Sequence, residues 1–313
     1  MTPTHRHEIL SLLRLTDPLP EHDLKPEGVA YVSGTVRRQR FSYAVPDPIA
    51  GGGATRRLES WLLRPSGGAG PWPAVIALHP HGDRFHLGGD EVAGQCGQRE
   101  HHYGAHLAAR GFVVLCPDLP CFGQQQALDS MPQEHRWEEH NLSRALAQGR
   151  SLLAETIDQL RCAVGAVLDY EKTAGLEVCV LGYGMGARTA AWLAFADTRV
   201  GSVWMHAGLG QQRILLERGR LLPRHNLLPG LHALGLDQAD IVASLLPRNL
   251  GISYGKEDRV AIPEAVAPVL EAVRERATHY PQGTVTILAG DYDHRFPLDV
   301  QQQIADKLLE WAK

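Results

Sequence analysis

The segment Gly182-Tyr183-Gly184-Met185-Gly186 constrains the fold more than any other part of this chain. It follows an apolar run, 177–181, and precedes a stretch of helix-forming residues, 187–196. A strand, a glycine-flanked tight turn and a helix have the geometry of a nucleophile elbow, whose central residue carries the attacking side chain, normally that of Ser, Cys or Asp. The central residue here is Gly184, which has no side chain. Any functional interpretation therefore has to account for a missing nucleophile.

Short apolar runs alternate with helix-like segments through most of the chain. We expect strands at 58–64, 74–78, 112–116, 178–181, 203–205, 250–254 and 285–288, and helices at 103–110, 151–170, 187–196 and 298–311. Continuous apolar strands that alternate with helices indicate a mostly parallel sheet covered by helices on both faces. The pattern predicts an α/β protein.

The chain divides into an N-terminal extension and one large domain. Residues 1–54 are the predicted extension, which ends in the loop-forming segment 46–53, and residues 55–313 are the predicted α/β domain. Two stretches, near 124–148 and 209–247, interrupt the alternation of strands and helices. We expect them to form a lid over the carboxyl edge of the sheet, where ligands bind in open α/β folds.

The amino-acid composition limits the kinds of molecule that the protein is expected to bind. The formal net charge is −4, which gives no electrostatic reason to expect nucleic acid. No stretch approaches the roughly 18 uncharged apolar residues of a membrane helix. Five cysteines without metal-ligand spacing fit reduced thiols. We expect a cytoplasmic protein with a small-molecule substrate, and whether it forms a homodimer stays open.

Three loops that follow predicted strands carry chemically useful residues. They are the elbow itself, the segment 254–260 and the segment 289–296. The second loop contains Asp258 and the third contains His294 in an Asp-His-Arg-Phe context. The order of nucleophile position, acid and histidine is the chain order of a Ser–Asp–His catalytic triad on an α/β sheet. We therefore predict that Asp258 orients His294 as a base.

Taken together, these motifs resemble the α/β-hydrolase superfamily, and within it the dienelactone hydrolase and acetyl xylan esterase-like branch. The resemblance covers about residues 55–313 and departs from the family at Gly184. The other segments that carry it are Leu78-His79-Pro80-His81-Gly82, Gly88-Gly89-Asp90-Glu91, 107–114 and 118–123.

The resemblance implies an α/β-hydrolase fold, a backbone oxyanion hole and a substrate pocket. The loop 79–82 corresponds to the oxyanion loop of the superfamily, so the backbone of His81 and Gly82 and the N–H of Met185 are the predicted donors. Backbone donors of this kind need no side chain at position 184. The residues expected to contact substrate are Tyr183, Cys121, Arg84 and His79.

Several functions are compatible with Gly184. The preferred one is non-covalent acid–base chemistry by His294 and Asp258 on a small carbonyl, ester or lactone compound: cyclisation, elimination, C–C cleavage or activation of water. One alternative is a carboxylic ester hydrolase, with a natural or an engineered replacement of its serine. Another is an inactive homologue that binds a ligand. In a further alternative Cys121 supplies the nucleophile, although a free cysteine is more often simply packed.

No metal or cofactor is predicted. His79, His81 and His86, with Asp83, match no zinc-ligand spacing, and no His-Glu-x-x-His motif occurs. The elbow glycines lack the full Gly-x-Gly-x-x-Gly spacing of a dinucleotide fingerprint.

Overall fold

In the computed structural model, which describes residues 2–21, 23–50, 52–126, 134–170, 172–220 and 222–312, the strands form one mixed sheet. The strands are β1 (Lys25–Ser33), β2 (Val36–Pro46), β3 (Thr55–Pro65), β4 (Trp72–Leu78), β5 (Val113–Pro117), β6 (Thr173–Tyr183), β7 (Val200–His206), β8 (Asn249–Gly255) and β9 (Val285–Gly290). Their order across the sheet is β1-β2-β3-β5-β4-β6-β7-β8-β9. Neighbours from β5 to β9 pair in parallel, whereas β1, β2, β3 and β5 pair antiparallel, so the prediction of a mostly parallel sheet is confirmed.

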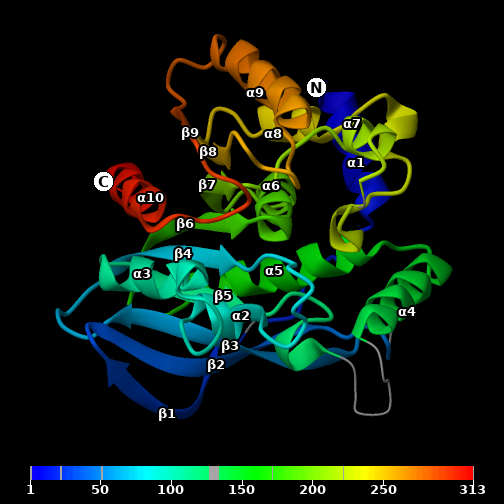
Figure 1. The fold of residues 1–313 in the computed structure, drawn as a ribbon. Helices are drawn as coiled ribbons and strands as arrows, with labels where there is room; N and C mark the ends of the chain where they lie inside the picture. The colour runs from blue at the N-terminus through cyan, green and yellow to red at the C-terminus, as the bar shows by residue number, and fades with distance from the viewer. Residues whose placement is uncertain are drawn as a thin grey trace.

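Helices cover both faces of this sheet (Figure 1). One face packs against α3 (Tyr103–Ala109) and α10 (Leu298–Trp311), and the other against α5 (Leu152–Leu168) and α6 (Met185–Ala196). Strand β6 shows why two layers form, because its side chains alternate between the faces. Val178 and Val180 belong to the core under α5 and α6, whereas Leu181 and Tyr183 belong to the core under α3 and α10.

The predicted N-terminal extension contributes to the same sheet. It contains α1 (Pro3–Leu13), β1 and β2, and β2 pairs with β3 along its whole length. Ile9 and Leu13 are fully buried in the core on the α5 side. We expected no strand in residues 1–54. The basic segment 37–40 obscures the β2 strand in the sequence. The residues after it alternate as a strand should, and Phe41, Tyr43 and Val45 are buried.

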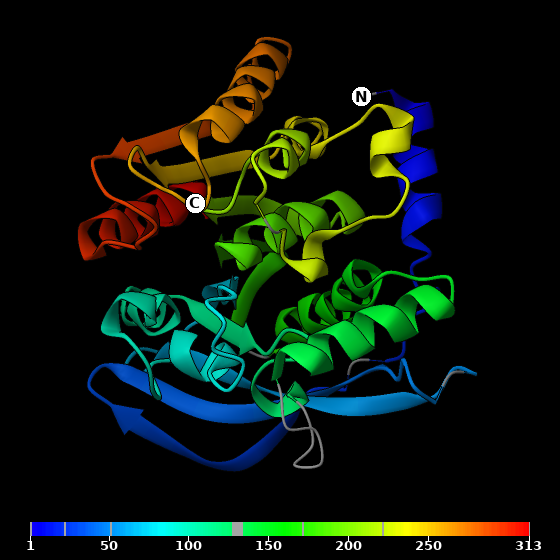
Figure 2. The ribbon, with the colours of Figure 1, turned by 45° about the vertical axis from the view of Figure 1, so that its right-hand side comes forward.

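Both predicted lid segments consist of short helices. The first contains η2 (Gly123–Gln125) and α4 (Glu134–Ala147), and its residues 127–133 lie outside the described residues. The second contains α7 (Gln212–Glu217), η3 (Arg224–Asn226), η4 (Leu231–Leu234) and α8 (Gln238–Ala243). Figure 2 shows α4 close to the segment that carries η3. The two segments are joined by a hydrogen bond from Arg224 to Glu138.

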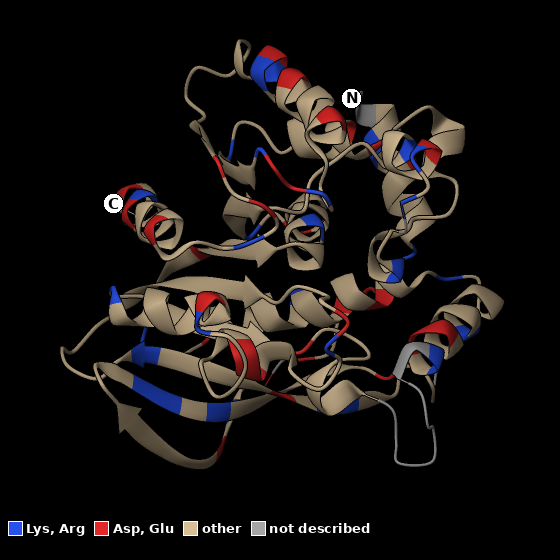
Figure 3. Ribbon diagram, viewed as in Figure 1, with Lys and Arg blue, Asp and Glu red and all other residues tan. Residues whose placement is uncertain are grey.

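The surface helices carry mixed charge. Acidic and basic residues occur side by side on α4, α9 (Pro263–Ala277) and α10 (Figure 3). Acidic residues are the more numerous on each helix, by three to two on α4 and α9 and by three to one on α10. Within the described ranges, no helix has both the length and the apolar character needed to cross a membrane.

The elbow glycines are required for two different reasons. Gly184 has φ 58° and ψ −114°, in the left-handed half of backbone space, at the point where β6 turns into α6. A Cβ on Gly182 would overlap the carbonyl oxygen of Gly186, so this position needs glycine for packing. A Cβ on Gly184 would instead lie 3.4 Å from Pro80 Cβ and 3.5 Å from His294 Nε2, which is ordinary contact. The centre of the elbow therefore has room for a side chain.

This difference predicts unequal costs for two alanine substitutions. Gly184→Ala should lower the free energy of unfolding by about 1–2 kcal/mol, because only the backbone conformation is unfavourable for a residue with Cβ. Gly182→Ala should cost about 3 kcal/mol or more, because a backbone carbonyl has to move. Urea unfolding of both variants measures the difference, and equal costs would contradict this account of the elbow.

Candidate active site

The structure brings Asp258 and His294 together at the carboxyl edge of the sheet. Asp258 follows β8 and His294 follows β9, and these strands are parallel neighbours. His294 Nδ1 donates a hydrogen bond of 2.8 Å to Asp258 Oδ2. The other carboxylate oxygen accepts from the backbone N–H groups of Val260 (2.7 Å) and Ala261 (2.9 Å). Both carboxylate oxygens of Asp258 therefore accept hydrogen bonds, one from the His294 imidazole and the other from the backbone.

The protonation of the pair follows from these contacts. Burial disfavours the charged form of Asp258, but the hydrogen bonds from His294 and from the two N–H groups outweigh it and lower the pKa of this carboxyl. An ionised Asp258 holds the proton of neutral His294 on Nδ1 and leaves Nε2 as a free base. Nε2 is the atom that lies 3.5 Å from the place of the missing Cβ on Gly184. This nitrogen therefore faces the space above Gly184, the predicted nucleophile position.

A chain of hydrogen bonds holds the His294 loop. The Trp204 indole donates to Ser253 Oγ (2.9 Å), which contacts His206 Nδ1 at 2.8 Å. His206 Nε2 donates to the carbonyl of Arg295 (2.7 Å), and the Tyr183 hydroxyl donates to the carbonyl of His294 (2.8 Å). The backbone carbonyls of His294 and of the residue that follows it are thus both held in place. We did not predict His206 from the sequence, since no local motif marks it.

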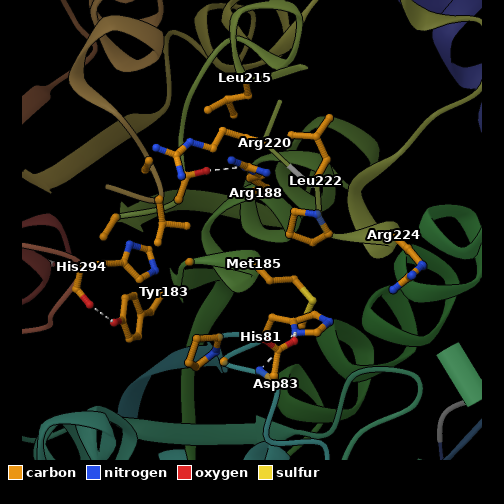
Figure 4. Close-up of a pocket in the computed structure, with 18 of the residues that line it drawn as sticks. His81, Asp83, Tyr183, Met185, Arg188, Leu215, Arg220, Leu222, Arg224 and His294 are labelled. Carbon is orange, nitrogen blue, oxygen red and sulfur yellow. Dashed lines mark hydrogen bonds and ion pairs between the residues drawn. The ribbon is translucent and has the colours of Figure 1, made fainter. Parts of the chain in front are cut away.

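A cavity of about 480 Å³ lies above the elbow (Figure 4). His294, Gly184, Met185 and Tyr183 form one part of its wall. Residues of both predicted lid segments contribute to the rest of the wall: Glu138, Leu215, Arg220, Leu222, Pro223 and Arg224. This cavity is large enough for a small organic substrate.

The predicted oxyanion donors border the same cavity. Met185 is the first residue of α6, where backbone N–H groups have no partner within the helix and the helix dipole is positive. His81 and Gly82 also line the cavity. The assignment of these three residues to an oxyanion hole stays a prediction.

Of the four residues expected to contact substrate, only Tyr183 lines the cavity. His79 is buried, donates from Nδ1 to the Pro80 carbonyl (2.9 Å) and accepts at Nε2 from Leu119 N–H (3.0 Å). Burial lowers the pKa of His79 to about 4, so it is a neutral structural residue. Arg84 is paired with Glu91 (3.0 Å). The Cys121 thiol is buried, which raises its pKa and keeps it protonated.

Three functional candidates have no signal in the sequence. Arg188 lies in α6, is 5% exposed and points into the cavity. Glu138 in α4 and His225 in η3 lie beside His81, and the three offer ligand atoms that are all within 4.8 Å of one another. They come from segments far apart in the chain, so only the folded structure brings them together. Such a group could hold a metal ion.

The sheet order, the elbow and the Asp–His pair define an α/β-hydrolase, which confirms the predicted fold. The sequence profile described as the dienelactone hydrolase family matches residues 62–219, half of the chain. The chain belongs to this family. No curated protein matches the sequence significantly.

Solved structures with the same fold carry the names of esterases. Acetyl xylan esterase 1 from Thermoanaerobacterium sp. is 16% identical, with a TM-score of 0.63 over 99% of this chain and 93% of that one. A glucuronoyl esterase from Solibacter usitatus is 12% identical, with a TM-score of 0.65 over 98% and 91%. A glucuronoyl esterase from Teredinibacter turnerae is 11% identical, with a TM-score of 0.68 over 98% and 84%. At these identities the likeness establishes the fold alone.

Buried His206 makes stability depend on pH. Burial lowers the pKa of His206 to about 3, whereas an exposed histidine in the unfolded chain has a pKa of about 6.5. The unfolded state therefore binds the proton first, and stability falls as the pH drops below about 6.5. In His206→Gln, the loss between pH 7.5 and pH 5 should be about 2 kcal/mol smaller than in the wild type. Urea unfolding at both pH values tests this, with exposed His7→Gln as the control. An unchanged pH dependence in His206→Gln would contradict the assignment.

Proposed function

We propose that this protein is a carboxylic ester hydrolase that cleaves an ester or lactone with a water molecule and forms no acyl-enzyme. The observation that carries the proposal is the position of His294 Nε2, which faces the vacant place above Gly184 at 3.5 Å from an ideal Cβ. Membership of the dienelactone hydrolase family and the esterase names of the structural neighbours support hydrolysis of an ester. The absent side chain supports direct attack by water.

Each proton has a place in this mechanism. A water molecule above Gly184 gives a proton to His294 Nε2, and its oxygen adds to the ester carbonyl carbon. Asp258 stabilises the imidazolium that forms. The carbonyl electrons move to the oxygen, where the Met185 N–H donates to the oxyanion. When the tetrahedral intermediate collapses, the leaving alkoxide takes the proton from Nε2, which yields the acid and the alcohol.

The same base and oxyanion donors would also serve elimination, cyclisation or C–C cleavage. Those reactions need a proton acceptor and an oxyanion hole and no covalent nucleophile. We place hydrolysis first because the family and the named neighbours are those of ester-cleaving enzymes.

Arg188 supports a substrate with a negative charge. Its Nε donates to the carbonyl of Gly208, and no carboxylate among the described residues pairs with it. Burial lowers the pKa of Arg188 to about 10, so the guanidinium stays charged at neutral pH. A buried cation without an anionic partner is unfavourable, and a substrate carboxylate in the cavity would offset that cost. We propose that the ester carries such a carboxylate.

Removal of the base should abolish most turnover. On any ester that the wild type cleaves, His294→Gln should lower kcat/KM about 10²- to 10⁴-fold, which is the usual contribution of a positioned base. A panel of aryl acetates, lactones and methyl esters of sugar acids supplies the substrates, and steady-state rates give the comparison. Full activity in His294→Gln would contradict the proposal.

Two further results separate this mechanism from its alternatives. Intact-mass spectra during turnover should show no acyl adduct on the wild type, whereas Gly184→Ser should accumulate one. An adduct on wild-type Cys121 would instead identify a relocated nucleophile. Stoichiometric binding of the panel without turnover would identify a ligand-binding protein.

The role of Arg188 predicts a split between substrates. Arg188→Gln should raise KM for esters that carry a carboxylate roughly 10- to 100-fold, the range for a lost charge-assisted hydrogen bond. Neutral esters of similar size should be affected much less. The exposed Arg218, changed to Gln, is the control for loss of an arginine away from the cavity wall. An equal loss on neutral and anionic esters would mean that Arg188 acts only through folding.

A further inference from the structure

A second group of polar side chains lies on the cavity wall away from His294. His81 follows β4, Glu138 lies in α4 and His225 lies in η3. Figure 4 shows His81 and His294 on different sides of Met185. The Glu138 and His225 side chains are fully buried and that of His81 is 18% exposed. The mechanism above uses none of these three side chains.

The spacing of the three side chains suits a metal ion. Glu138 Oε1 lies 3.2 Å from His81 Nε2 and 3.0 Å from His225 Nδ1. Tetrahedral zinc with bonds of about 2.0–2.1 Å separates its ligand atoms by about 3.3 Å. The three ligand atoms are all within 4.8 Å of one another, so small side-chain movements would close the site. Two histidines and one glutamate are a ligand set of catalytic zinc sites.

The hydrogen bonds of His225 leave its Nδ1 available to bind a cation. Its Nε2 lies 2.7 Å from the carbonyl oxygen of Pro120, which can only accept, so Nε2 carries a proton. In a neutral imidazole Nδ1 is then a bare acceptor, and it faces the Glu138 carboxylate, another acceptor. Within the described part of the chain, His225 Nδ1 makes no hydrogen bond although it is fully buried. A metal ion between Nδ1 and Oε1 would convert this repulsion into two bonds.

The surroundings resemble the outer shell of a metal site. Metal-bound histidines usually donate their second nitrogen to a carbonyl or carboxylate, which fixes the ring. His225 does so to Pro120, and His81 Nδ1 lies 3.1 Å from Asp83 Oδ1, although the Asp83 backbone N–H also lies within donating distance of it, at 3.3 Å. The ring of Phe122 packs against both imidazoles, with centroids at 5.1 and 5.7 Å.

The main competing arrangement is a second proton on His225. It would place another buried cation beside a carboxylate whose Oε2 already binds Arg224 at 2.5 Å. It would also leave the new N–H without a well-directed acceptor, because the contact to Oε1 lacks hydrogen-bond geometry. A metal ion is also a buried cation, but it bonds to the lone pairs of Nδ1 and Oε1 directly and needs no N–H directed between them.

We propose that His81, Glu138 and His225 bind a divalent transition-metal ion, zinc by ligand type, with its open coordination position toward the cavity. His81 and Glu138 line the cavity and His225 does not, which places the open side of the site there. The open position would accept a carboxylate or carbonyl oxygen of a bound compound. The ion would also connect the loop after β4 to both lid segments. Metal binding is independent of ester hydrolysis by His294, so either proposal can fail alone.

Zinc titration of untagged, chelator-treated full-length protein tests the site. Isothermal titration calorimetry should show one high-affinity Zn²⁺ per chain, and Co²⁺ should give the visible absorption of a four- or five-coordinate site. Glu138→Gln and His81→Ala should weaken Zn²⁺ binding at least 100-fold. Glu139→Gln is the matched control, because Glu139 is the exposed neighbour and also contacts Arg224. That variant should bind as the wild type does.

Two outcomes would overturn the proposal. One is the absence of stoichiometric Zn²⁺ binding by the folded wild-type protein. The other is Zn²⁺ binding that persists in both ligand variants, which would locate the ion on other histidines. Circular dichroism shows whether the variants fold, and His81→Ala is the safer one because its side chain is the least buried. Anomalous diffraction from Zn²⁺-soaked wild-type crystals decides the location without any variant: a peak between the three residues supports the site, and a peak elsewhere refutes it.

Discussion

The hydrogen bond between Asp258 and His294 is the interaction on which this site depends. Neighbouring parallel strands bring the two residues to one edge of the sheet, and burial alone would favour a neutral Asp258. The imidazole and two backbone N–H groups keep the carboxylate ionised, and the ionised carboxylate in turn holds the proton of a neutral imidazole on Nδ1, so that Nε2 is the nitrogen with a free lone pair. Tyr183 and His206 hold the backbone carbonyls of His294 and Arg295, which fixes the direction of that nitrogen toward the elbow. The base is thus positioned by groups that never reach the substrate.

Gly184 shows that the elbow and its nucleophile are separable. The turn is imposed by close packing of Gly182 and Gly186 against backbone carbonyls, and neither contact involves position 184. The oxyanion donor predicted at the Met185 N–H, at the N-terminus of α6, needs no side chain at position 184, because a backbone donor does not depend on the side chain before it. In the proposed mechanism, only the covalent step is lost with the serine side chain. The volume left above Gly184 lies directly in front of the base, where a water molecule can take the place of the hydroxyl.

The sequence allowed the sheet, the elbow, Asp258 and His294 to be predicted because each is encoded locally. Apolar runs mark the buried strands, and the chain order of the loops after β6, β8 and β9 is retained in the sheet. Glu138, Arg188 and His225 could not be found in this way, since their roles arise from packing between segments far apart in the chain. The same limit explains why His79 and Arg84, which were expected to contact substrate, do not line the cavity. Both lie near the predicted oxyanion loop, but His79 is held by Leu119 and Arg84 by Glu91, through contacts that no local pattern indicates.

The polar groups of the cavity favour one kind of substrate. The base is confined to one side, where Asp258 compensates its charge during the reaction. Arg188 contributes a cation that forms no ion pair with a described carboxylate, although Asp237 and Asp258 lie near enough to stabilise it, and a metal ion held by His81, Glu138 and His225 would add a second centre of positive charge. Within a largely apolar pocket, separated cationic centres bind an oxygen-rich anionic compound better than a neutral one. A substrate carboxylate held at either centre would fix the distance between its ester group and His294. The pocket would therefore select substrates by the spacing between their carboxylate and their ester group.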